Sequence, residues 1–442
     1  MLGSPTGRYN LVKAPVFIQA RIPMGDTSII EIDLVALDRN LRQLRGLVGP
    51  SCAICPVLKA DAYGFGVVRI ARRLERMGCE CMAVFAPSEA ALLLDSGIRT
   101  PILVMKPVHD LTELKNCKPW LRSGRVHLTL HDRDQLDRLA GSRVAFDQSL
   151  PVHLEIDTGM SRGGCGPEQA GALLEMVAKS RQFRLAGIFT HFACADFDPD
   201  FTRRQMDTFE RFLHEHRIAI NPDCVIHAAN SYATLRDTRY HRSMVRVGLA
   251  WAGYGKEWMT GPVGRHQDVE LMPILRWTSE ITLIKTIEKG ATVGYGATWT
   301  ASRPTVLGII PVGYADGYPV RPDRIASGMT VASVGVMVDS VALNKPAYAP
   351  VVGTMSMNLI TIDLTDVVRE FGHHEVKPGT MVELISNDPH APNHLPALAK
   401  IAGLIPHEVL CGLNPRIRRV YRDASVSVET CETKPTATSD VT

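Results

Sequence analysis

The sequence has little net charge and no long hydrophobic run. Its 49 Lys and Arg residues against 46 Asp and Glu leave a formal charge of +3. The basic run RIRRVYR at 416–422 is typical of a solvated strand, so we expect no nucleic acid partner. No apolar segment approaches the ~20 residues that span a bilayer, and the first thirty residues lack a signal peptide pattern. We expect a soluble, cytoplasmic protein without a membrane partner.

Several common functional motifs are also missing. The chain contains no P-loop, no G-x-G-x-x-G dinucleotide fingerprint and no H-E-x-x-H zinc motif. Cys52 and Cys55 form a C-x-x-C pair, but they lie inside a strand pattern and no second pair completes a zinc site. The ten cysteines are scattered, as is usual in a reducing compartment. We therefore expect no metal site.

The chain does contain a regular alternation of short apolar runs with segments of helical period. Such alternation is typical of βαβ units and a parallel sheet. Eight apolar runs occur, at 53–59, 82–86, 101–105, 125–130, 152–157, 185–191, 224–229 and 244–249. Eight β/α units predict a closed (β/α)8 TIM-type barrel with its chemistry at the carboxyl ends of the strands, and an open doubly wound sheet is the alternative.

The texture changes after about residue 270, where alternating, turn-rich segments such as TVLGIIPVGYADGYPV indicate a second, mainly β domain. The predicted α/β chain thus divides into an N-terminal extension (1–28), the barrel (29–268), the β domain (269–423) and a polar tail (424–442). The two ends have little periodicity.

If the barrel closes, the residues at its strand ends converge on one site. A lysine there, Lys59, loses solvation, and the neutral amine that results is the form that builds Schiff bases. On strand position alone, a snorkelling lysine at the barrel rim is the more common interpretation. Ser231, Gly248 and Tyr63 would add donors of the kind that hold phosphate. An amine for an aldehyde beside donors for a phosphate is what pyridoxal 5′-phosphate requires.

The motifs around these residues carry a resemblance to a known family. The blocks VLKADAYGFG, DTGMSRGG, THFACAD, HAANSYATL, VGYGATWTA, VGYADGYP and VGTMSMN occur in order between EIDLVALDRNL (31–41) and CGLNPRIRRVY (411–421). In these blocks the chain resembles the alanine racemase family, whose members are barrel-type pyridoxal phosphate enzymes. The resemblance implies an isomerase that interconverts L- and D-alanine and, in a bacterium, supplies a peptidoglycan precursor.

The resemblance also implies residue roles. Lys59 would carry the cofactor and act as one of two bases, and Tyr295 would be the other, reaching over from the second subunit of a homodimer. Arg162 and the amide of Met357 would bind the substrate carboxylate. The implied cofactor-binding residues are Tyr63, His191, Asn230, Ser231, Arg246, Gly248 and Leu249, with Arg246 donating to the ring nitrogen and His191 lying against the ring.

The sequence departs from the family pattern at four positions. Glu155 stands where many racemases carry a carbamylated lysine, and we expect its carboxylate to bind Arg162 directly. Asn358, Val320 and His407 replace an aspartate, an arginine and a tyrosine near the entrance, whereas the gate positions Tyr314 and Asp196 are kept.

These departures leave the substrate range open. His407 could widen the pocket for serine or larger substrates, or the changes could be neutral, with Arg321 or Tyr318 compensating. Two further functions remain as alternatives, a non-catalytic pyridoxal phosphate-binding protein and a barrel-type decarboxylase. The presence of the Tyr295 motif disfavours the first, and an Arg162 that clamps the carboxylate disfavours the second. The favoured direction in the cell and the role of the terminal extensions also stay open.

Overall fold

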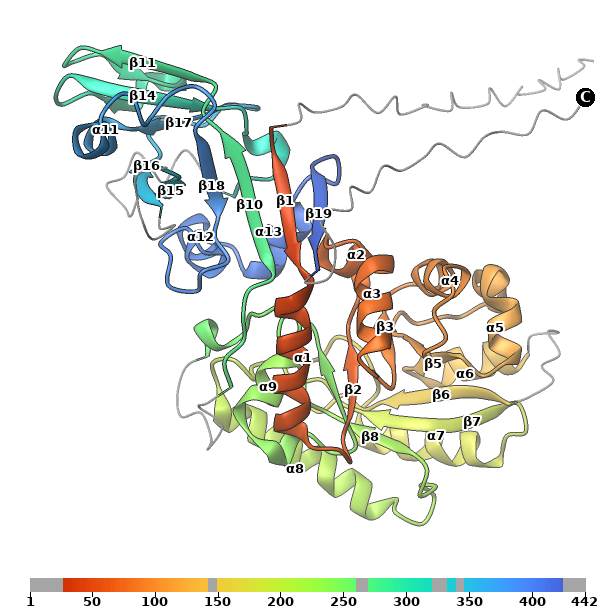
Figure 1. Ribbon diagram of the computed structural model, residues 1–442. Helices are drawn as coiled ribbons and strands as arrows, with labels where there is room; N and C mark the ends of the chain where they lie inside the picture. The colour runs from red at the N-terminus through yellow and green to blue at the C-terminus, as the bar shows by residue number, and fades with distance from the viewer. Residues whose placement is uncertain (1–26, 142–148, 260–268, 320–331, 339–345, 424–442) are drawn as a thin grey trace, which may run out of the picture.

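The computed structural model describes residues 27–141, 149–259, 269–319, 332–338 and 346–423, and its barrel lies at one end of the molecule (Figure 1). Eight parallel strands follow one another around it, and a bridge between Val57 and Ala83 closes the ring. The strands are β2 (Ala53–Pro56), β3 (Met82–Val84), β4 (Ile102–Val104), β5 (Val126–Leu130), β6 (Leu150–Glu155), β7 (Phe183–Phe189), β8 (Val225–His227) and β9 (Met244–Val247). All eight predicted strands are confirmed, and the open sheet is wrong.

Amphipathic helices cover the outside of the barrel (Figure 1). In α3 (Val67–Arg76), for example, the buried side chains recur at helical spacing while the arginines face outward. The remaining barrel helices are α1 (Leu34–Val48), α2 (Lys59–Tyr63), α4 (Pro87–Asp95), α5 (Lys118–Arg122), α6 (Arg133–Ala140), α7 (Pro167–Lys179), α8 (Pro199–Glu215) and α9 (Ser231–Arg236). Side-chain caps begin several of them, as Asp33 does for α1 by accepting from two backbone amides.

The second domain is mainly β, as predicted. A six-stranded sheet has the order β16 (Ala347–Pro350), β15 (Ser333–Val336), β18 (Met381–Ile385), β10 (Leu275–Glu280), β1 (Ile29–Asp33) and β19 (Arg418–Arg422). A smaller sheet has the order β11 (Leu283–Ile287), β14 (Thr305–Ile310) and β17 (Ile360–Asp363), and β12 (Thr292–Val293) pairs with β13 (Trp299–Thr300). Among its described residues the domain also has three α-helices, α11 (Thr365–Phe371), α12 (Leu395–Ala402) and α13 (Pro406–Gly412).

The strand β1 differs from the expected division at residue 29, because it pairs with strands of the second domain. It runs antiparallel to β10 and parallel to β19, away from the barrel strands (Figure 1). Its alternation of buried Ile30 and Ile32 with less buried residues suits any half-covered sheet, so the local pattern does not specify the partner. The RIRRVYR segment is confirmed as strand β19. The chain therefore enters and leaves the barrel through the same sheet.

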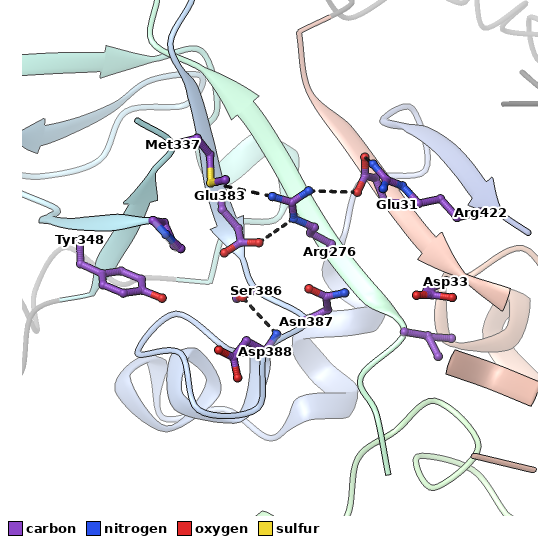
Figure 2. Close-up of a pocket in the computed structure, with 12 residues that line it drawn as sticks. Glu31, Asp33, Arg276, Met337, Tyr348, Glu383, Ser386, Asn387, Asp388 and Arg422 are labelled. Atoms are coloured by element: carbon purple, nitrogen blue, oxygen red, sulfur yellow. Dashed lines mark hydrogen bonds and ion pairs between the residues drawn. The ribbon is translucent and has the colours of Figure 1, made fainter. Parts of the chain in front are cut away.

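A pocket of about 380 Å³ lies where β1, β10 and β18 meet. Figure 2 shows Arg276 at its wall between Glu383 of β18 and Glu31 of β1. Arg276 donates to Glu383 over 2.6 Å and contacts Glu31 at 3.4 Å, and Arg422 also pairs with Glu31. These ion pairs join four neighbouring strands of the sheet, β18, β10, β1 and β19.

No single helix in the described part of the chain is long and apolar enough to cross a membrane. The pair α12 and α13, with a bend of 96° between them, has that length and composition only when the two helices are taken together. Within those ranges, no cluster of three or more His, Cys, Asp or Glu side chains has a metal-binding arrangement.

Candidate active site

Lys59 lies directly after β2, at the start of an unusual turn. The four residues that follow it, Ala60 to Tyr63, all have left-handed backbone angles, with φ between 53° and 57°. A left-handed conformation costs a non-glycine residue about 1–2 kcal/mol, so four in succession need strong support from their surroundings. Strain of this kind concentrates at functional sites because the fold must over-determine it there.

Side chains from three parts of the chain hold this turn. The carboxylate of Glu89 accepts from the Ala60 amide at 2.7 Å and from the amides of Phe85 and Ala86 at 2.8 and 2.9 Å. Asp61 accepts from the amide of Val67 at 2.7 Å. The hydroxyl of Tyr421, in β19, donates to the carbonyl of Phe65 at 2.8 Å. The β domain therefore helps to fix the position of Lys59.

The amine of Lys59 is biased toward its neutral form. Burial lowers its pKa from the ordinary value, and the positive charge of Arg162 adds to the effect. Arg162 itself is exposed. A partly buried lysine with a lowered pKa at the carboxyl end of a barrel strand is suited to attack a carbonyl carbon.

Tyr63, Ser231 and Gly248 come together beside the turn. The Ser231 hydroxyl oxygen accepts from the amides of Gly248 and Ala250 at 2.8 and 3.2 Å. A Cβ atom at residue 248 would lie 2.5 Å from the Tyr63 hydroxyl oxygen, so only glycine leaves room there. Asn230 caps α9 by accepting from the Ala233 amide at 3.0 Å. Hydroxyls and amides gathered on a glycine at a helix start fit a phosphate group.

Arg246, on β9, places a guanidinium in the buried interior. It donates to Nδ1 of His227 at 2.8 Å, to the carbonyl of Thr190 at 2.9 Å and to Nδ1 of His191 at 3.2 Å. Its guanidinium also stacks over the Phe189 ring at 4.8 Å. Burial lowers the pKa of Arg246 to about 10, which leaves the group a cation and a pure donor at neutral pH. Burial also holds the pKa of His191 well below its usual range.

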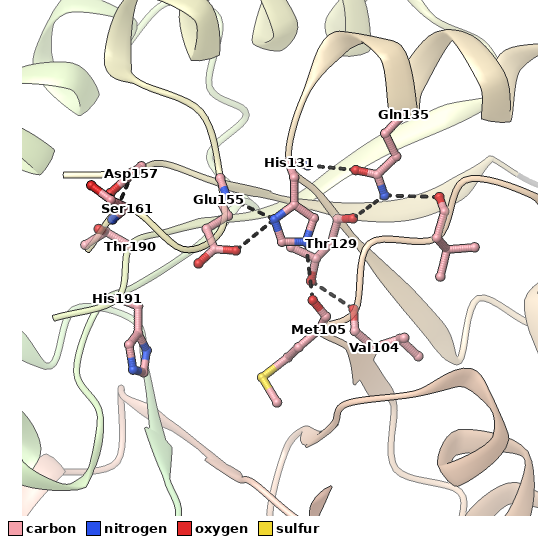
Figure 3. A network of polar contacts seen from close by, with 12 residues as sticks. Val104, Met105, Thr129, His131, Gln135, Glu155, Asp157, Ser161, Thr190 and His191 are labelled. Carbon is pink, nitrogen blue, oxygen red and sulfur yellow. Dashed lines mark hydrogen bonds and ion pairs between the residues drawn. The ribbon is translucent and has the colours of Figure 1, made fainter. Parts of the chain in front are cut away.

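Glu155 makes a different contact from the one predicted. Its carboxylate lies 3.0 Å from Nδ1 of His131, and Figure 3 shows the two side chains facing each other at the strand ends of β6 and β5. Within the described residues no hydrogen bond or ion pair joins Glu155 to Arg162, so the expected direct bond is not present in this structure. Arg162 is exposed, whereas the less exposed Glu155 faces His131.

Four predicted site residues lie on loops of the β domain that adjoin one another. Tyr295 follows β12 and its side chain is 73% exposed, while those of Tyr314 and Met357 are each 54% exposed. The loops that carry them adjoin, since the Ala315 amide donates to the Met357 carbonyl at 3.0 Å and a bridge joins Gly294 to Thr354. Asn358 is exposed in the same loop. Among the described residues, no hydrogen bond, ion pair or ring contact joins Lys59 to Tyr295.

The gate positions His407 and Asp196 contact residues of the barrel. His407, at the start of α13, packs edge-on against Tyr63 with ring centroids 5.6 Å apart. Burial lowers the pKa of His407 to about 4, and the charge of Lys59 acts in the same direction. The backbone carbonyl of Asp196 accepts from Arg236 at 2.9 Å. Val320 lies outside the described residues.

Some residues of the site were not predicted from the sequence. Glu89 holds the backbone of the turn after Lys59 and His131 faces Glu155, yet each is an ordinary polar residue in a helix or loop pattern. His153 and His227 lie inside apolar strand runs, and that position was the available signal, because a histidine there needs a partner.

Both domains of the chain match models of the alanine racemase family. Residues 32–256 match the model of the alanine racemase N-terminal domain, and residues 274–421 match that of the C-terminal domain. A curated alanine racemase of Sorangium cellulosum is 36% identical over 399 residues, covering 89% of this chain and 98% of the relative. One from a Nostoc species is 30% identical, covering 88% of this chain and 95% of the relative.

Solved structures agree. The alanine racemase of a D-cycloserine-producing Streptomyces lavendulae superposes with a TM-score of 0.75 at 27% identity, covering 90% of this chain and 97% of that one. The alanine racemase of Bartonella henselae, solved with covalently bound pyridoxal phosphate, superposes with a TM-score of 0.71 at 26% identity, covering 90% of this chain and 100% of that one.

The role of Glu89 can be tested by Glu89→Ala. Removing the carboxylate leaves the Ala60, Phe85 and Ala86 amides without their acceptor, so we expect the free energy of unfolding to fall by about 1–3 kcal/mol. Urea denaturation measures the change. The matched control is Glu175→Ala, which removes an exposed carboxylate on α7 and should change stability little. Equal effects of the two substitutions would contradict the assigned support of the turn.

Proposed function

The chain belongs to the alanine racemase family, and we propose that it is a pyridoxal 5′-phosphate-dependent isomerase that interconverts L- and D-alanine. The observation that carries the proposal is the placement of Lys59. Its amine, with a lowered pKa, lies at a barrel strand end beside the Tyr63, Ser231 and Gly248 cluster. A cytoplasmic location and a supply of D-alanine for a bacterial cell wall are part of the proposal and rest on family membership.

The residues present fit the cofactor. Tyr63, Ser231 and the amides of Gly248 and Leu249 would hold its phosphate, with Asn230 fixing the start of α9 behind them. Arg246 would donate to the ring nitrogen and His191 would lie against the ring. When bound, the cofactor supplies an aldehyde for an amine and an electron-withdrawing ring that acidifies the α-hydrogen of the amino acid. Arg246 is always a donor, so it would keep the ring nitrogen unprotonated.

Racemisation needs a proton acceptor on one face of the α-carbon and a proton donor on the other. The amine of Lys59 would serve one face and the phenol of Tyr295 the other. A tyrosine phenolate at pH 7 costs ~4 kcal/mol unless nearby cations or hydrogen bonds favour it. Arg246, joined to His191 by a hydrogen bond, is the cation that would act on Tyr295 through that imidazole.

The exposure of Tyr295 and Met357 on the isolated chain supports a homodimer with shared sites. Neither residue is needed for the β domain core, and both lie on one face formed by adjoining loops. In a two-fold dimer this face of one subunit would meet the barrel mouth of its partner. Met357 would then present its amide to the substrate carboxylate beside Arg162. Tyr314 and Asn358 would line the entrance, opposite Asp196.

In this proposal Glu155 helps to position the loop that carries Arg162, although it does not bind Arg162 directly. Its carboxylate lies 3.0 Å from Nδ1 of His131, and the Gly164 amide donates to that same nitrogen at 2.9 Å. The loop DTGMSRGG that bears Arg162 therefore starts and ends at fixed points. Substrate binding would draw the exposed Arg162 inward toward a carboxylate already in place.

The first experiment is chiral chromatography of L-alanine incubated with the protein and pyridoxal phosphate. We expect D-alanine to accumulate toward equal amounts of the two enantiomers, and Lys59→Ala to lose at least about a thousandfold in rate, because both the cofactor anchor and one base are removed. Tyr295→Phe should lose one proton-transfer route. If the wild-type protein binds the cofactor without forming D-alanine, the non-catalytic alternative replaces this proposal.

Shared sites predict complementation between two inactive variants. A heterodimer of one Lys59→Ala subunit and one Tyr295→Phe subunit, purified through two different affinity tags, contains one site with both defects and one intact site. We expect it to recover about half of the wild-type kcat, whereas each parental homodimer stays inactive. A heterodimer as inactive as its parents would show that Lys59 and Tyr295 act within one subunit.

A broader substrate range is the second candidate, and the packing of His407 against Tyr63 near Lys59 favours it. Imidazole is shorter than phenol, so His407→Tyr should narrow the pocket and lower the serine-to-alanine ratio of kcat/KM by about tenfold. Asn358→Asp, which restores the family residue in the Met357 loop of the β domain, is the matched comparison. An unchanged ratio in His407→Tyr would leave strict alanine specificity as the simpler interpretation.

A further inference from the structure

The barrel interior contains a line of histidines that leads to Arg246. Nδ1 of His127, on β5, lies 2.9 Å from Nε2 of His153, on β6. Nδ1 of His153 lies 2.9 Å from Nε2 of His227, on β8, and Nδ1 of His227 lies 2.8 Å from Arg246 on β9. The line therefore crosses the barrel from the first half of β5 to the strand ends at the site.

The hydrogens along this line are fixed by the guanidinium. Arginine can only donate, so Nδ1 of His227 must accept and its hydrogen must be on Nε2. That N–H can only donate to Nδ1 of His153, and the same argument places the next hydrogen on Nε2 of His153, facing Nδ1 of His127. His127 then carries its hydrogen on Nε2, and it bonds a backbone group of Gly124, whose carbonyl can accept. Every donor has one acceptor.

We propose that His227, His153 and His127 form a one-way hydrogen-bond chain that orients the Arg246 guanidinium, and that His153 and His127 are positioning residues of the site. The proposal deepens the proposed function, on which its catalytic consequence rests. No atom of His153 or His127 has to touch substrate or cofactor. They act by giving the guanidinium one neutral acceptor in one fixed direction.

The surrounding packing is shaped for neutral imidazoles in these positions. A Cβ atom at Gly187 would lie 2.3 Å from Nδ1 of His153, so glycine on β7 leaves the space for that ring. The Phe189 ring stacks on His227 with centroids 4.7 Å apart. Burial lowers the pKa of all three histidines, to about 4 for His127.

The charged and titratable groups around the line act in both directions. Arg184 near His127 and Arg246 at the far end disfavour further positive charge, as the neighbouring imidazoles do. Glu155 and the Cys55 thiol face Arg246 and favour its charge, whereas Arg162 opposes it. Lys59 and Arg162 act on His191, beside the site end of the line.

A proton added to His127 would reverse the whole chain. Doubly protonated His127 would present an N–H to Nε2 of His153, which would have to move its own hydrogen to Nδ1. His227 would then have to do the same, and its Nδ1–H would face the donor of Arg246. Protonation at the far end thus breaks the bond that orients the guanidinium, so the line works only while all three rings are neutral.

The first test is ¹⁵N NMR of histidine-labelled dimer, with pyridoxal phosphate and no substrate, with signals assigned through single variants. We expect His127, His153 and His227 to carry hydrogen on Nε2 only, from about pH 8 to about pH 5.5, although a free histidine titrates near 6.5. A hydrogen on Nδ1 of any of the three, or a positive charge in this range, overturns the proposal. This result does not depend on racemase activity.

The second test compares two substitutions of His127. Asparagine places its amide oxygen near the position of Nδ1 and keeps the acceptor, whereas leucine leaves the N–H of His153 buried without one. We expect His127→Leu to lower kcat about tenfold with little change in KM, and His127→Asn to stay within about twofold of wild type. His214→Gln, at an exposed position of α8, is the control. Equal losses in the Leu and Asn variants would overturn the positioning role.

A third measurement covers the case in which the leucine variant does not fold. Because the unfolded chain protonates His127 near pH 6.5 and the folded chain only near pH 4, the stability due to the neutral ring is complete above pH 6.5 and is lost as the pH falls toward 4. We would measure the free energy of unfolding in urea for wild type and His127→Asn from about pH 7.5 to about pH 5. This free energy should depend less steeply on pH in the variant, by the equivalent of about one bound proton. Identical slopes would overturn a neutral His127.

Discussion

The buried cation of Arg246 is the constraint on which the barrel interior depends. A charge in a low-dielectric interior is tolerated only when hydrogen bonds replace the lost water. No carboxylate bonds Arg246 among the described residues, and its acceptors are two imidazole nitrogens and backbone carbonyls. These neutral acceptors take the N–H hydrogen bonds of Arg246 without neutralising its positive charge. The electric field of the guanidinium therefore still acts on the site. Any residue that alters the neutrality of those acceptors alters the field.

The second constraint comes from the β domain. The left-handed turn after Lys59 is held from one side by Glu89 of the barrel and from the other by Tyr421 of β19, which lies beside β1. Because β1 starts the barrel segment and β19 ends the β domain, the two domains share one sheet at their junction. The lysine is thus fixed by both domains of its own chain, while the exposed Tyr295 loop is free to serve another subunit.

Much of this arrangement was predictable from the sequence, and the reasons for the rest are physical. The eight strands and the positions of Lys59, Ser231 and Arg246 at strand ends follow from local periodicity. The partner of β1 does not, because an alternating strand fits any half-covered sheet. The contact of Glu155 with His131 depends on the relative placement of β5 and β6, which the motif pattern does not carry. Each histidine of the line appears alone in an apolar run, and only the closed barrel brings them into contact.

The substitutions at the site can be interpreted together in these terms. Glu155 supplies a carboxylate from the chain itself, and this carboxylate faces His131 at the strand ends. His407 replaces a phenol with an imidazole that burial and Lys59 keep neutral at physiological pH. The two departures therefore change the shape of the site and leave the sign of its field intact. Cationic Arg246 and neutral imidazoles remain on the cofactor side, and Arg162 remains free for a carboxylate. In the proposed racemase these charges would suit the reaction, and His407 and the loop that carries Asn358 would set the size of the side chain that the site admits.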